Sequence, residues 1–553
     1  MPNQISGGEV VVASLLANGV NTVFGIPGSH NLSIYDALAR NREIQHITVR
    51  HEQGAGFMAD GYARASGIPG VCITTTGPAA LNVMTSLGTA YADSSPVMLI
   101  ASQNHSASIG MEKGLIHELS NQLEALRTVT SFASRPVTVG DIARCMNTGF
   151  ESMRSGRPRP VAVEIPFNLL DDTDRVTVNP SRSLTHPSPS TADIDRTSRI
   201  LESAKKPILL AGGGVVTSGA SLELVSLAEI LQAPVFTTVM GKGSIPGDHR
   251  LSAGSALVHP ASRDYLAECD VLLAVGTRFT DEETDSWNLQ LPPQLIQIDI
   301  DPREIERNYK LTLGILGDAT EVLRRLNADM ENRISPDLDE RAAEVGRLQN
   351  TIVDDCRQKA PAGVELVDVL RSTLPRDTVV VSDLTLAAYW CRRLLKVFGP
   401  RQNIYPWGFG TLGFGLPAAI GAKIAKPDAP VIAICGDGGL MFSIQELSTA
   451  VKYDVAVVVL VFNDQSYGVL AKQQQARFGR KIGITLQNPD FLSLARSFGI
   501  MAERAETFAQ LSAALSRAIE SESIRLIEVT VPVPWPVMEP SVELFKGQQE
   551  LIQ

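Results

Sequence analysis

Two apolar runs in the last third of the chain predict neighbouring strands of a parallel sheet. One run covers residues 431–435, and the other gives eight apolar residues in succession over 455–462. Unbroken apolar runs are typical of strands that are buried on both faces. Between the two runs, apolar residues follow the helical repeat at Ile444, Leu447, Ala450 and Val451. The segment therefore predicts a strand, a helix and a second strand in a βαβ unit.

The same alternation of strand-like and helix-like segments continues along the 553 residues, which predicts an α/β fold of doubly wound domains with mostly parallel sheets. Two polar stretches interrupt it. Residues 171–195 indicate a surface linker, and residues 335–360 indicate a helix plus a connection. Four prolines between residues 531 and 540 exclude a regular helix there and predict a segment that lies along the surface. We expect an N-terminal domain over 1–175, a central domain over 190–335, a C-terminal domain over 358–535 and a tail over 536–553.

Charge and cysteine usage narrow the class of protein. The formal net charge is −11 and no long Lys/Arg block occurs, so nucleic acid is not an expected partner. No apolar stretch approaches the ~18 residues of a membrane span and no targeting pattern opens the chain, so we expect a soluble, cytoplasmic protein with no membrane partner. Six cysteines without CxxC spacing and eight histidines without an HExxH pattern favour reduced core thiols over a zinc site.

A carboxylate follows each of the two predicted strands, at Asp437 and Asp464. Ligands of parallel sheets bind beyond the carboxyl ends of the strands, so the two side chains can converge there. Gly436, Gly438 and Gly439 would let backbone N–H groups approach an anion, and carboxylate oxygens suit Mg2+. The alternative is a tight glycine turn that the aspartates only cap.

A second candidate lies far upstream, at Glu52 in the segment RHEQGAG. The small residues Gly54, Ala55 and Gly56 would allow close approach of a ligand. The alternative is an exposed acid at the start of a helix, near the positive end of the helix dipole.

Taken together, these two segments resemble the thiamine diphosphate (ThDP) enzymes that act on 2-oxo acids. The resemblance covers nearly all of the chain, because four further segments look like acetolactate-synthase-type proteins in the same order. These are TTTGPAALNVMTSLGTAYADSSPVMLIASQ, APVFTTVMGKGSIPGDH, IQIDIDP and GFGTLGFGLPAAIGA. FGIPGSHNLSIYDAL and RHEQGAGFMADGYARASGIPGVC, followed by GLIHEL, resemble the branch that contains 5-guanidino-2-oxopentanoate decarboxylase.

The resemblance implies a pyrimidine-binding N-terminal domain, a central Rossmann-like domain and a C-terminal domain that binds the diphosphate and Mg2+. It implies decarboxylation of a 2-oxo acid through an enamine/carbanion intermediate that is protonated to release an aldehyde. An alternative is a carboligase of the acetolactate synthase type, which hands that intermediate to a second 2-oxo acid or an aldehyde. A third possibility, from another class, is a catalytically silent ThDP-binding scaffold protein.

The family also implies roles for particular residues. Glu52 would be the catalytic carboxyl that holds ring nitrogen N1' of the cofactor. The metal would bind Asp437, Asp464 and the backbone carbonyl of Ser466. Leu412 would support the bent cofactor, with ordinary core packing as the alternative. The expected cofactor contacts are Pro27, Gly28, Gly77, Asn82, Thr385, Gly410, Leu412, Gly436, Asp437, Gly438, Gly439, Asp464, Tyr467 and Gly468.

The expected substrate contacts are His30, His117, Gln122 and Gln473. Gln473 replaces a tryptophan that selects the larger acceptor in several acetolactate synthases. Glu118 or Glu112 could provide a carboxylate for a basic 2-oxo acid.

Three departures from the family pattern affect these expectations. Asp464 stands where many relatives have Asn, a change that keeps an oxygen ligand for Mg2+. Leu386 and Ala387 stand where acetolactate synthases offer a Gln-His pair to the diphosphate. In the central domain, the stretch TRFTD over 277–281 keeps only part of the Arg-Phe-Asp-Asp-Arg sequence beside which acetolactate synthases carry FAD, so FAD is doubtful.

The central domain also contains a glycine turn in KKPILLAGGGVV without the GxGxxG register, which favours a structural domain without a cofactor. By resemblance, the N-terminal and C-terminal domains of different subunits meet at each active site. A homodimer is then the minimum assembly, and a homotetramer is common in such proteins.

Overall fold

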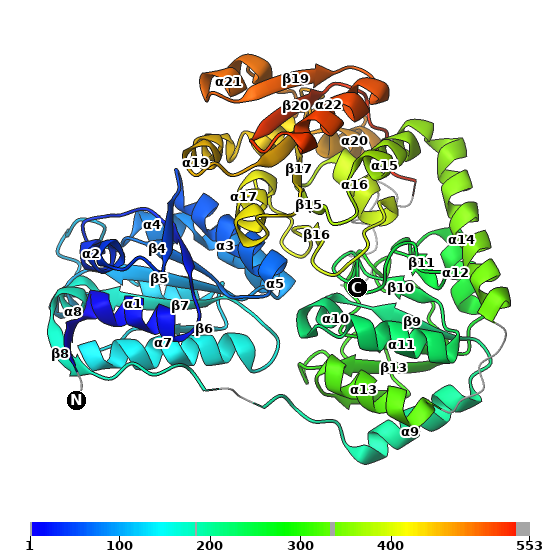
Figure 1. The fold of residues 1–553 in the computed structure, drawn as a ribbon, viewed down its shortest axis with the longest axis horizontal. Helices are drawn as coiled ribbons and strands as arrows, with labels where there is room; N and C mark the ends of the chain where they lie inside the picture. The colour runs from blue at the N-terminus through cyan, green and yellow to red at the C-terminus, as the bar shows by residue number, and fades with distance from the viewer. Residues whose placement is uncertain (1–2, 183–184, 332–337, 538–553) are drawn as a thin grey trace.

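The computed structural model describes residues 3–182, 185–331 and 338–537, and it divides the chain into three α/β units (Figure 1). Each unit contains a six-stranded sheet, and every neighbouring pair of strands in the three sheets is parallel. The predicted fold class of doubly wound domains with mostly parallel sheets is confirmed. The exact limits of the domains stay a prediction.

The N-terminal unit has the strand order β3-β2-β4-β5-β7-β6. Its central strands are buried along their whole length, as their apolar runs require. The elements are β1 Asn3–Ser6, α1 Gly7–Ala17, β2 Thr22–Gly25, α2 Leu32–Arg40, β3 Gln45–Thr48, α3 Glu52–Ser66, β4 Gly70–Thr74, α4 Pro78–Asn82, α5 Met84–Asp93, β5 Val97–Gln103, a 3-10 turn Ser106–Ser108, α6 Gln122–Arg127, β6 Phe132–Ser134, α7 Val139–Arg154, β7 Val161–Pro166, α8 Phe167–Asp171 and β8 Thr173–Val176.

Strand β8 corrects the prediction that residues 171–195 form only a linker. It pairs antiparallel with β1 in a two-stranded ribbon, separate from the large sheet. Its first three residues are exposed and only Val176 is buried against the core, which is why the composition resembles that of a loop.

The central unit has the strand order β11-β10-β9-β12-β13-β14, the order of a doubly wound nucleotide-binding sheet. The elements are α9 Thr191–Ser203, β9 Pro207–Ala211, α10 Gly213–Ser218, α11 Ser221–Leu231, β10 Val235–Thr237, β11 Ser252–Gly254, α12 Pro260–Ala267, β12 Val271–Val275, β13 Gln294–Asp299, β14 Leu313–Leu316 and α13 Ala319–Met330. The helix α14, Leu338–Lys359, follows along the edge of the molecule towards the C-terminal unit (Figure 1).

The C-terminal unit has the strand order β16-β15-β17-β18-β20-β19. The elements are α15 Pro361–Thr373, β15 Val379–Ser382, α16 Leu386–Leu394, β16 Asn403–Ile404, α17 Gly415–Ala425, β17 Val431–Gly436, α18 Asp437–Leu440, a 3-10 turn Ile444–Glu446, α19 Leu447–Lys452, β18 Val457–Phe462, α20 Gly468–Phe478, α21 Phe491–Ser497, β19 Met501–Ala505, α22 Phe508–Glu520 and β20 Arg525–Val529.

The predicted βαβ unit is present, but two details of it were wrong. The crossover is not one helix, because α18, the 3-10 turn and α19 follow one another and Val451 is 42% exposed. The second strand begins at Val457 rather than Val455, since the amide of Val457 donates to the carbonyl oxygen of Val455 instead of joining the sheet ladder.

The proline-rich segment after β20 is not helical over residues 531–537 and packs on the C-terminal unit, as expected. The indole nitrogen of Trp390 donates to the carbonyl oxygen of Pro534 at 2.9 Å, and Trp535 makes an edge contact with Tyr389. The remainder of the predicted tail, 538–553, lies outside the described residues.

Helices α3 and α17 form the contact between the N-terminal and C-terminal units (Figure 1). A Cβ at Gly61 would lie 2.0 Å from the carbonyl oxygen of Ala418, and a Cβ at Gly421 would lie 1.9 Å from that of Met58. These paired contacts show that the two helices run antiparallel with their backbones in direct contact. Leu416 and Ala419 belong to the apolar core that both units share around this helix pair.

The cysteine prediction agrees with the structure, in which all six cysteines are buried free thiols. Within the described residues, no helix has the length and apolar character that a membrane span requires.

A glycine-to-alanine substitution tests the close packing of α3 on α17. Because a side chain at position 61 meets backbone, we expect Gly61→Ala to lower the free energy of unfolding by about 2 kcal/mol or more. The matched control is Gly346→Ala, an exposed position in α14 with open space around its Cβ, where alanine stabilises a helix by up to ~1 kcal/mol. Urea unfolding measures both; equal midpoints for the two variants would contradict the packing.

Candidate active site

Asp437 and Asp464 follow β17 and β18 at the carboxyl edge of the C-terminal sheet. The Asn488 side-chain amide donates to Asp437 at 2.7 Å, and the backbone amide of Ser466 donates to Asp464 at 3.1 Å. Burial raises the pKa of Asp437. The pKa of Asp464 is also raised, mainly by burial and secondly by the negative charge of Asp437. The two carboxylates are therefore close enough to repel each other, and a cation bound between them would relieve that repulsion.

These oxygen donors fit a hard metal ion. In the described part of the chain, no three His, Cys, Asp or Glu side chains form a complete metal site. A cation at Asp437 and Asp464 would take its other ligands from main-chain carbonyls such as that of Ser466, from water, or from a diphosphate. This ligand set suits Mg2+ and does not suit zinc.

The loops beyond these strands pack so closely that glycine is required. A Cβ at Gly438 would lie 2.6 Å from the ring of Tyr467, and a Cβ at Gly468 would lie 2.6 Å from the carboxylate of Asp464. A Cβ at Gly436 would lie 3.3 Å from the side chain of Thr385, the residue before α16. The structure thus brings together the residues that the resemblance assigns to the diphosphate. Leu386 and Ala387 are buried apolar residues and offer it no polar group.

Asp383 is a third carboxylate at this edge, and it was not among the residues predicted from the sequence. It follows β15, and it accepts hydrogen bonds from the amides of Leu384, Gly413 and Gly415. Its side chain is fully buried, and burial raises its pKa to about 6. The rule that identified Asp437 and Asp464, an acid directly after a buried apolar strand, could have found it.

Asp383 and Asp93 hold the loop that contains Gly410 and Leu412 from two sides. Asp93, at the end of α5, accepts hydrogen bonds from the amides of Trp407 and Gly408 at 2.9 and 2.7 Å. Gly410 has a φ of 66°, a conformation that favours glycine. Leu412 is half-buried, so part of its side chain remains available to a ligand.

Glu52 is the first residue of α3 in the N-terminal unit, and its carboxylate accepts a hydrogen bond from the side chain of Asn82 at 2.9 Å. The interpretation of the neighbouring small residues as room for a ligand was wrong. A Cβ at Gly54 would lie 2.5 Å from the carboxylate of Glu446, and a Cβ at Gly56 would lie 1.8 Å from the hydroxyl of Ser86. Protein side chains occupy that space.

His30 and His117 lie together in the same unit. Their rings meet edge to face at 5.7 Å, and His30 also stacks on Phe167 at 5.3 Å. Atom Nδ1 of His30 is hydrogen-bonded to the hydroxyl of Thr76 at 2.9 Å. Burial and the neighbouring His117 lower the pKa of His30, which favours a neutral imidazole.

Gln122 is buried beneath the turn at Gly77 and does not face solvent, although it was expected to contact substrate. Its side chain is 1% exposed, accepts from the amide of Gly77 and donates to the carbonyl oxygen of Ser102. Both ends of the amide are therefore used by the protein. The loop turn at Gly28 is likewise packed against Thr75, beside the exposed Pro27.

Glu118 does not offer a free carboxylate to a substrate. It accepts hydrogen bonds from the amides of Lys113, Gly114 and Leu115, and these bonds lower its pKa. The suggestion that it serves a basic 2-oxo acid therefore conflicts with its position, because it closes its own loop. Glu112 is exposed in that loop, and Gln473 is half-buried on α20.

The two halves of the predicted site lie at opposite ends of the α3–α17 pair. Glu52 begins α3, whereas Gly410 and Leu412 precede the first residue of α17. Because the helices are antiparallel, the start of α3 lies towards the end of α17. An 11-residue helix is about 16 Å long. One chain therefore does not bring its own Glu52 to its own Leu412.

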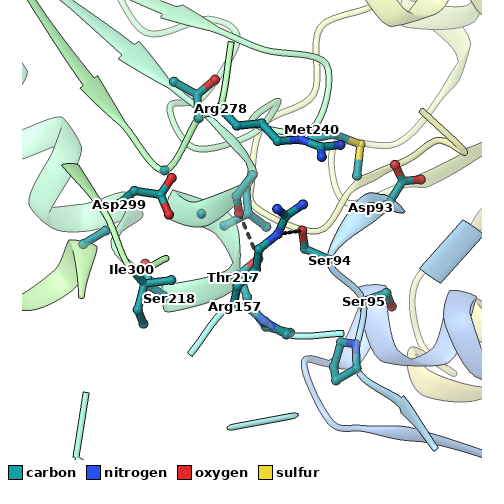
Figure 2. Close-up of a pocket in the computed structure, with 18 of the residues that line it drawn as sticks. Asp93, Ser94, Ser95, Arg157, Thr217, Ser218, Met240, Arg278, Asp299 and Ile300 are labelled. Carbon is teal, nitrogen blue, oxygen red and sulfur yellow. Dashed lines mark hydrogen bonds between the residues drawn. The ribbon is translucent and has the colours of Figure 1, made fainter. Parts of the chain in front are cut away.

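The central unit contains a cavity of about 490 Å3 against the N-terminal unit (Figure 2). It lies at the carboxyl ends of β9 and β12, where the strand order reverses and such sheets bind ligands. Figure 2 shows Arg157 reaching Ser94, and Arg157 also pairs with Glu304 at 2.6 Å. The expectation of a purely structural domain did not anticipate this cavity. Its size lies in the range of cofactor sites, about 300–1,000 Å3. The sequence-based expectation that FAD binding is doubtful stays untested by this cavity.

Family models match three parts of the chain. Residues 5–125 match "Thiamine pyrophosphate enzyme, N-terminal TPP binding domain", residues 194–326 match the central domain of the same enzymes, and residues 383–529 match their C-terminal TPP binding domain. Asp383, Asp437 and Asp464 fall within the last match.

Curated relatives match along almost the whole chain. A probable 2-ketoarginine decarboxylase of Pseudomonas aeruginosa is 37% identical, over 95% of this chain and 94% of its own. A probable acetolactate synthase large subunit of Methanocaldococcus jannaschii is 36% identical, over 95% of this chain and 92% of its own. The acetolactate synthase isozyme 3 large subunit of Escherichia coli is 34% identical, over 96% and 95%.

The raised pKa of Asp383 predicts a pH-dependent cost to stability. In the folded chain its pKa is about 6 instead of 3.8, so the free energy of unfolding falls as the pH rises from about 4 to above 6. The shift corresponds to about 3 kcal/mol. Asp383→Asn lacks this ionisation, so the melting temperature of wild type minus that of the variant should decrease from pH 4.5 to pH 7.5. A difference that does not change with pH would contradict the assignment.

Proposed function

Since this chain belongs to the thiamine diphosphate enzymes, we propose that it is a Mg2+-dependent decarboxylase that converts a 2-oxo acid into CO2 and an aldehyde. The observation that carries the proposal is the placement of Glu52, half-exposed at the start of α3 and hydrogen-bonded to Asn82. A carboxyl there can hold a proton at the pyrimidine ring nitrogen of the cofactor, which general acid–base chemistry on this cofactor requires.

The bound cofactor supplies a nucleophilic carbon and accepts the electrons that the departing CO2 leaves behind. The chain supplies binding and orientation. Asp437 and Asp464 would hold Mg2+ against the diphosphate, Thr385 and the amides of the 436–439 turn would contact the diphosphate, and Leu412 would support the cofactor from below.

Two histidines support decarboxylation followed by protonation. Because Thr76 holds Nδ1 of His30, Nε2 is left for a substrate or a proton. The ring of His117 lies 5.7 Å from that of His30, so both imidazoles are available at the same place. Proton donors of this kind favour protonation of the carbon that has lost CO2, after which the neutral aldehyde is released.

The name of one relative supports the substrate class. The 2-ketoarginine decarboxylase matches this chain over 95% of its length, so a basic 2-oxo acid is the first candidate. Ligation to a second 2-oxo acid is the second candidate function, because relatives named acetolactate synthases match almost equally well.

A homodimer is part of the proposal, with Glu52 of one chain completing the site that Asp437 and Leu412 of the other chain begin. The separation of the two halves along α3 and α17 supports it. Exposed apolar side chains flank both halves, and burial in an assembly would account for them. They are Leu81, Phe409, Met441, Phe442, Leu470 and Phe478. Assembly of two dimers into a tetramer and a cytoplasmic location belong to the same proposal.

Product identification tests the reaction. The purified protein, with thiamine diphosphate and Mg2+, is incubated separately with pyruvate, 5-guanidino-2-oxopentanoate and a branched 2-oxo acid. We expect CO2 and the matching aldehyde, with turnover highest for the basic acid, and Glu52→Gln should reduce turnover at least about a hundredfold. Acetolactate as the main product would replace this function with the carboligase, and full turnover by Glu52→Gln would refute the role of Glu52.

Mixed dimers test the two-chain site. Glu52→Gln and Asp437→Ala should each inactivate the homodimer, because each damages both sites. A mixed dimer, isolated with two different affinity tags, has one site that contains both mutations and one site that contains neither. Its activity should be about half that of wild type. A mixed dimer as inactive as its parents would contradict the assignment of Glu52 and Asp437 to different chains.

A further inference from the structure

A carboxylate from the C-terminal unit is buried against the backbone that leads into Glu52. Glu446 is 0% exposed and lies in the 3-10 turn nine residues after Asp437. It accepts hydrogen bonds from the amide of Arg50 at 3.1 and 3.2 Å and from the amide of His51 at 3.1 Å. The hydroxyl of Thr449 donates to it at 2.6 Å.

These contacts hold the start of α3. Arg50 and His51 are the two residues before Glu52. His51 is the N-cap of α3, so its amide is among those that a helix leaves without an intrahelical partner. His51 caps the helix itself, because its Nδ1 accepts from the amide of Gln53. With both preceding amides bound to Glu446, the Cα of Glu52 cannot shift without breaking hydrogen bonds to a buried carboxylate, which is costly.

Two further contacts around Glu446 restrict how the C-terminal unit packs on the start of α3. Gly54 is required because a Cβ would lie 2.5 Å from the carboxylate of Glu446. At the other end of α19, the hydroxyl of Tyr453 accepts from the amide of Thr48 at 2.8 Å and donates to the hydroxyl of Thr48 at 3.0 Å. The C-terminal unit thus bonds to the segment between β3 and α3 at two places, through Tyr453 at Thr48 and through Glu446 at Arg50 and His51.

We propose that Glu446 is a positioning residue for Glu52 of its own chain: it fixes the backbone from which Glu52 reaches the cofactor. The inference rests on the proposed function, in which Glu52 acts on the pyrimidine ring. It assigns Glu446 to the Glu52 half of the site, although its place in the sequence, just after the diphosphate turn, points to the other half.

The first test compares Glu446→Ala with Glu446→Gln. Gln keeps an acceptor for both amides, whereas Ala removes it. In Glu446→Ala, we expect two rates to fall about tenfold or more: the exchange of the C2 proton of bound thiamine diphosphate for deuterium, and kcat. KM and cofactor affinity should stay within about threefold of wild type. Gln should restore most of both rates.

Ser448→Ala is the matched control. Ser448 lies in α19, directly after the 3-10 turn that contains Glu446, and the one hydrogen bond its hydroxyl makes within the described residues is to the carbonyl oxygen of Gln445 in that turn. If Glu446→Ala does not fold, Thr449→Val keeps the carboxylate but removes its hydroxyl donor, and should slow exchange in the same direction by about threefold. An exchange rate equal to that of wild type in Glu446→Ala would overturn the inference. If Glu446→Ala does not fold, the same result in Thr449→Val would overturn it. Equal loss in Ala and Gln would overturn it too.

Mixed dimers identify the half of the site on which Glu446 acts. A dimer of a Glu446→Ala chain and an Asp437→Ala chain should reach about half of wild-type activity, whereas a dimer of Glu446→Ala and Glu52→Gln chains should stay low. The reverse pattern would overturn the inference while leaving the proposed function intact. If the mixed dimer of Glu52→Gln and Asp437→Ala chains does not regain activity, the two-chain site is refuted. The comparison of Glu446→Ala with Glu446→Gln would then still decide the role of Glu446.

Discussion

The backbone contact between α3 and α17 constrains the rest of the structure. Gly61 and Gly421 let the two helices touch without intervening side chains, and this contact joins the N-terminal and C-terminal units into one body. Its antiparallel direction also separates Glu52 from Leu412 within a chain. One packing interaction therefore joins the two units of each chain and keeps the two halves of the candidate site apart within that chain, which is the basis of the proposed dimer.

Buried carboxylates connect this packing to the chemistry. Asp383 and Asp93 bind backbone amides on the two sides of the Gly410–Leu412 loop, and Glu446 binds the amides that precede Glu52. In each case a charge that is costly to bury is offset by several N–H donors from a loop. These hydrogen bonds restrain the backbone of each loop, and such restraint favours a fixed orientation of a bound cofactor.

The strands and the acids at their ends could be predicted from the sequence, because both depend on local patterns of residues. Apolar runs predicted the strands, and acids directly after them predicted Asp437 and Asp464; the resemblance to thiamine diphosphate enzymes is confirmed by the family models. The contacts of Glu446 could not be predicted, since its partners lie 395 and 396 residues away and no local pattern links them. For the same reason Gly54 was interpreted as room for a ligand, and Glu118 as a substrate carboxylate rather than a brace within its loop. The strand β8 was missed because a polar surface ribbon has the composition of a linker.

The central claim is that each active site combines Glu52 of one chain with Asp437 of another. A structure of the assembled protein with thiamine diphosphate and Mg2+ tests it most directly. The account predicts the pyrimidine ring nitrogen within hydrogen-bond distance of Glu52 from one subunit, and the metal on Asp437 and Asp464 of its neighbour. A cofactor that contacts Glu52 and Asp437 of the same chain, or one that is bound away from Glu52, would contradict it.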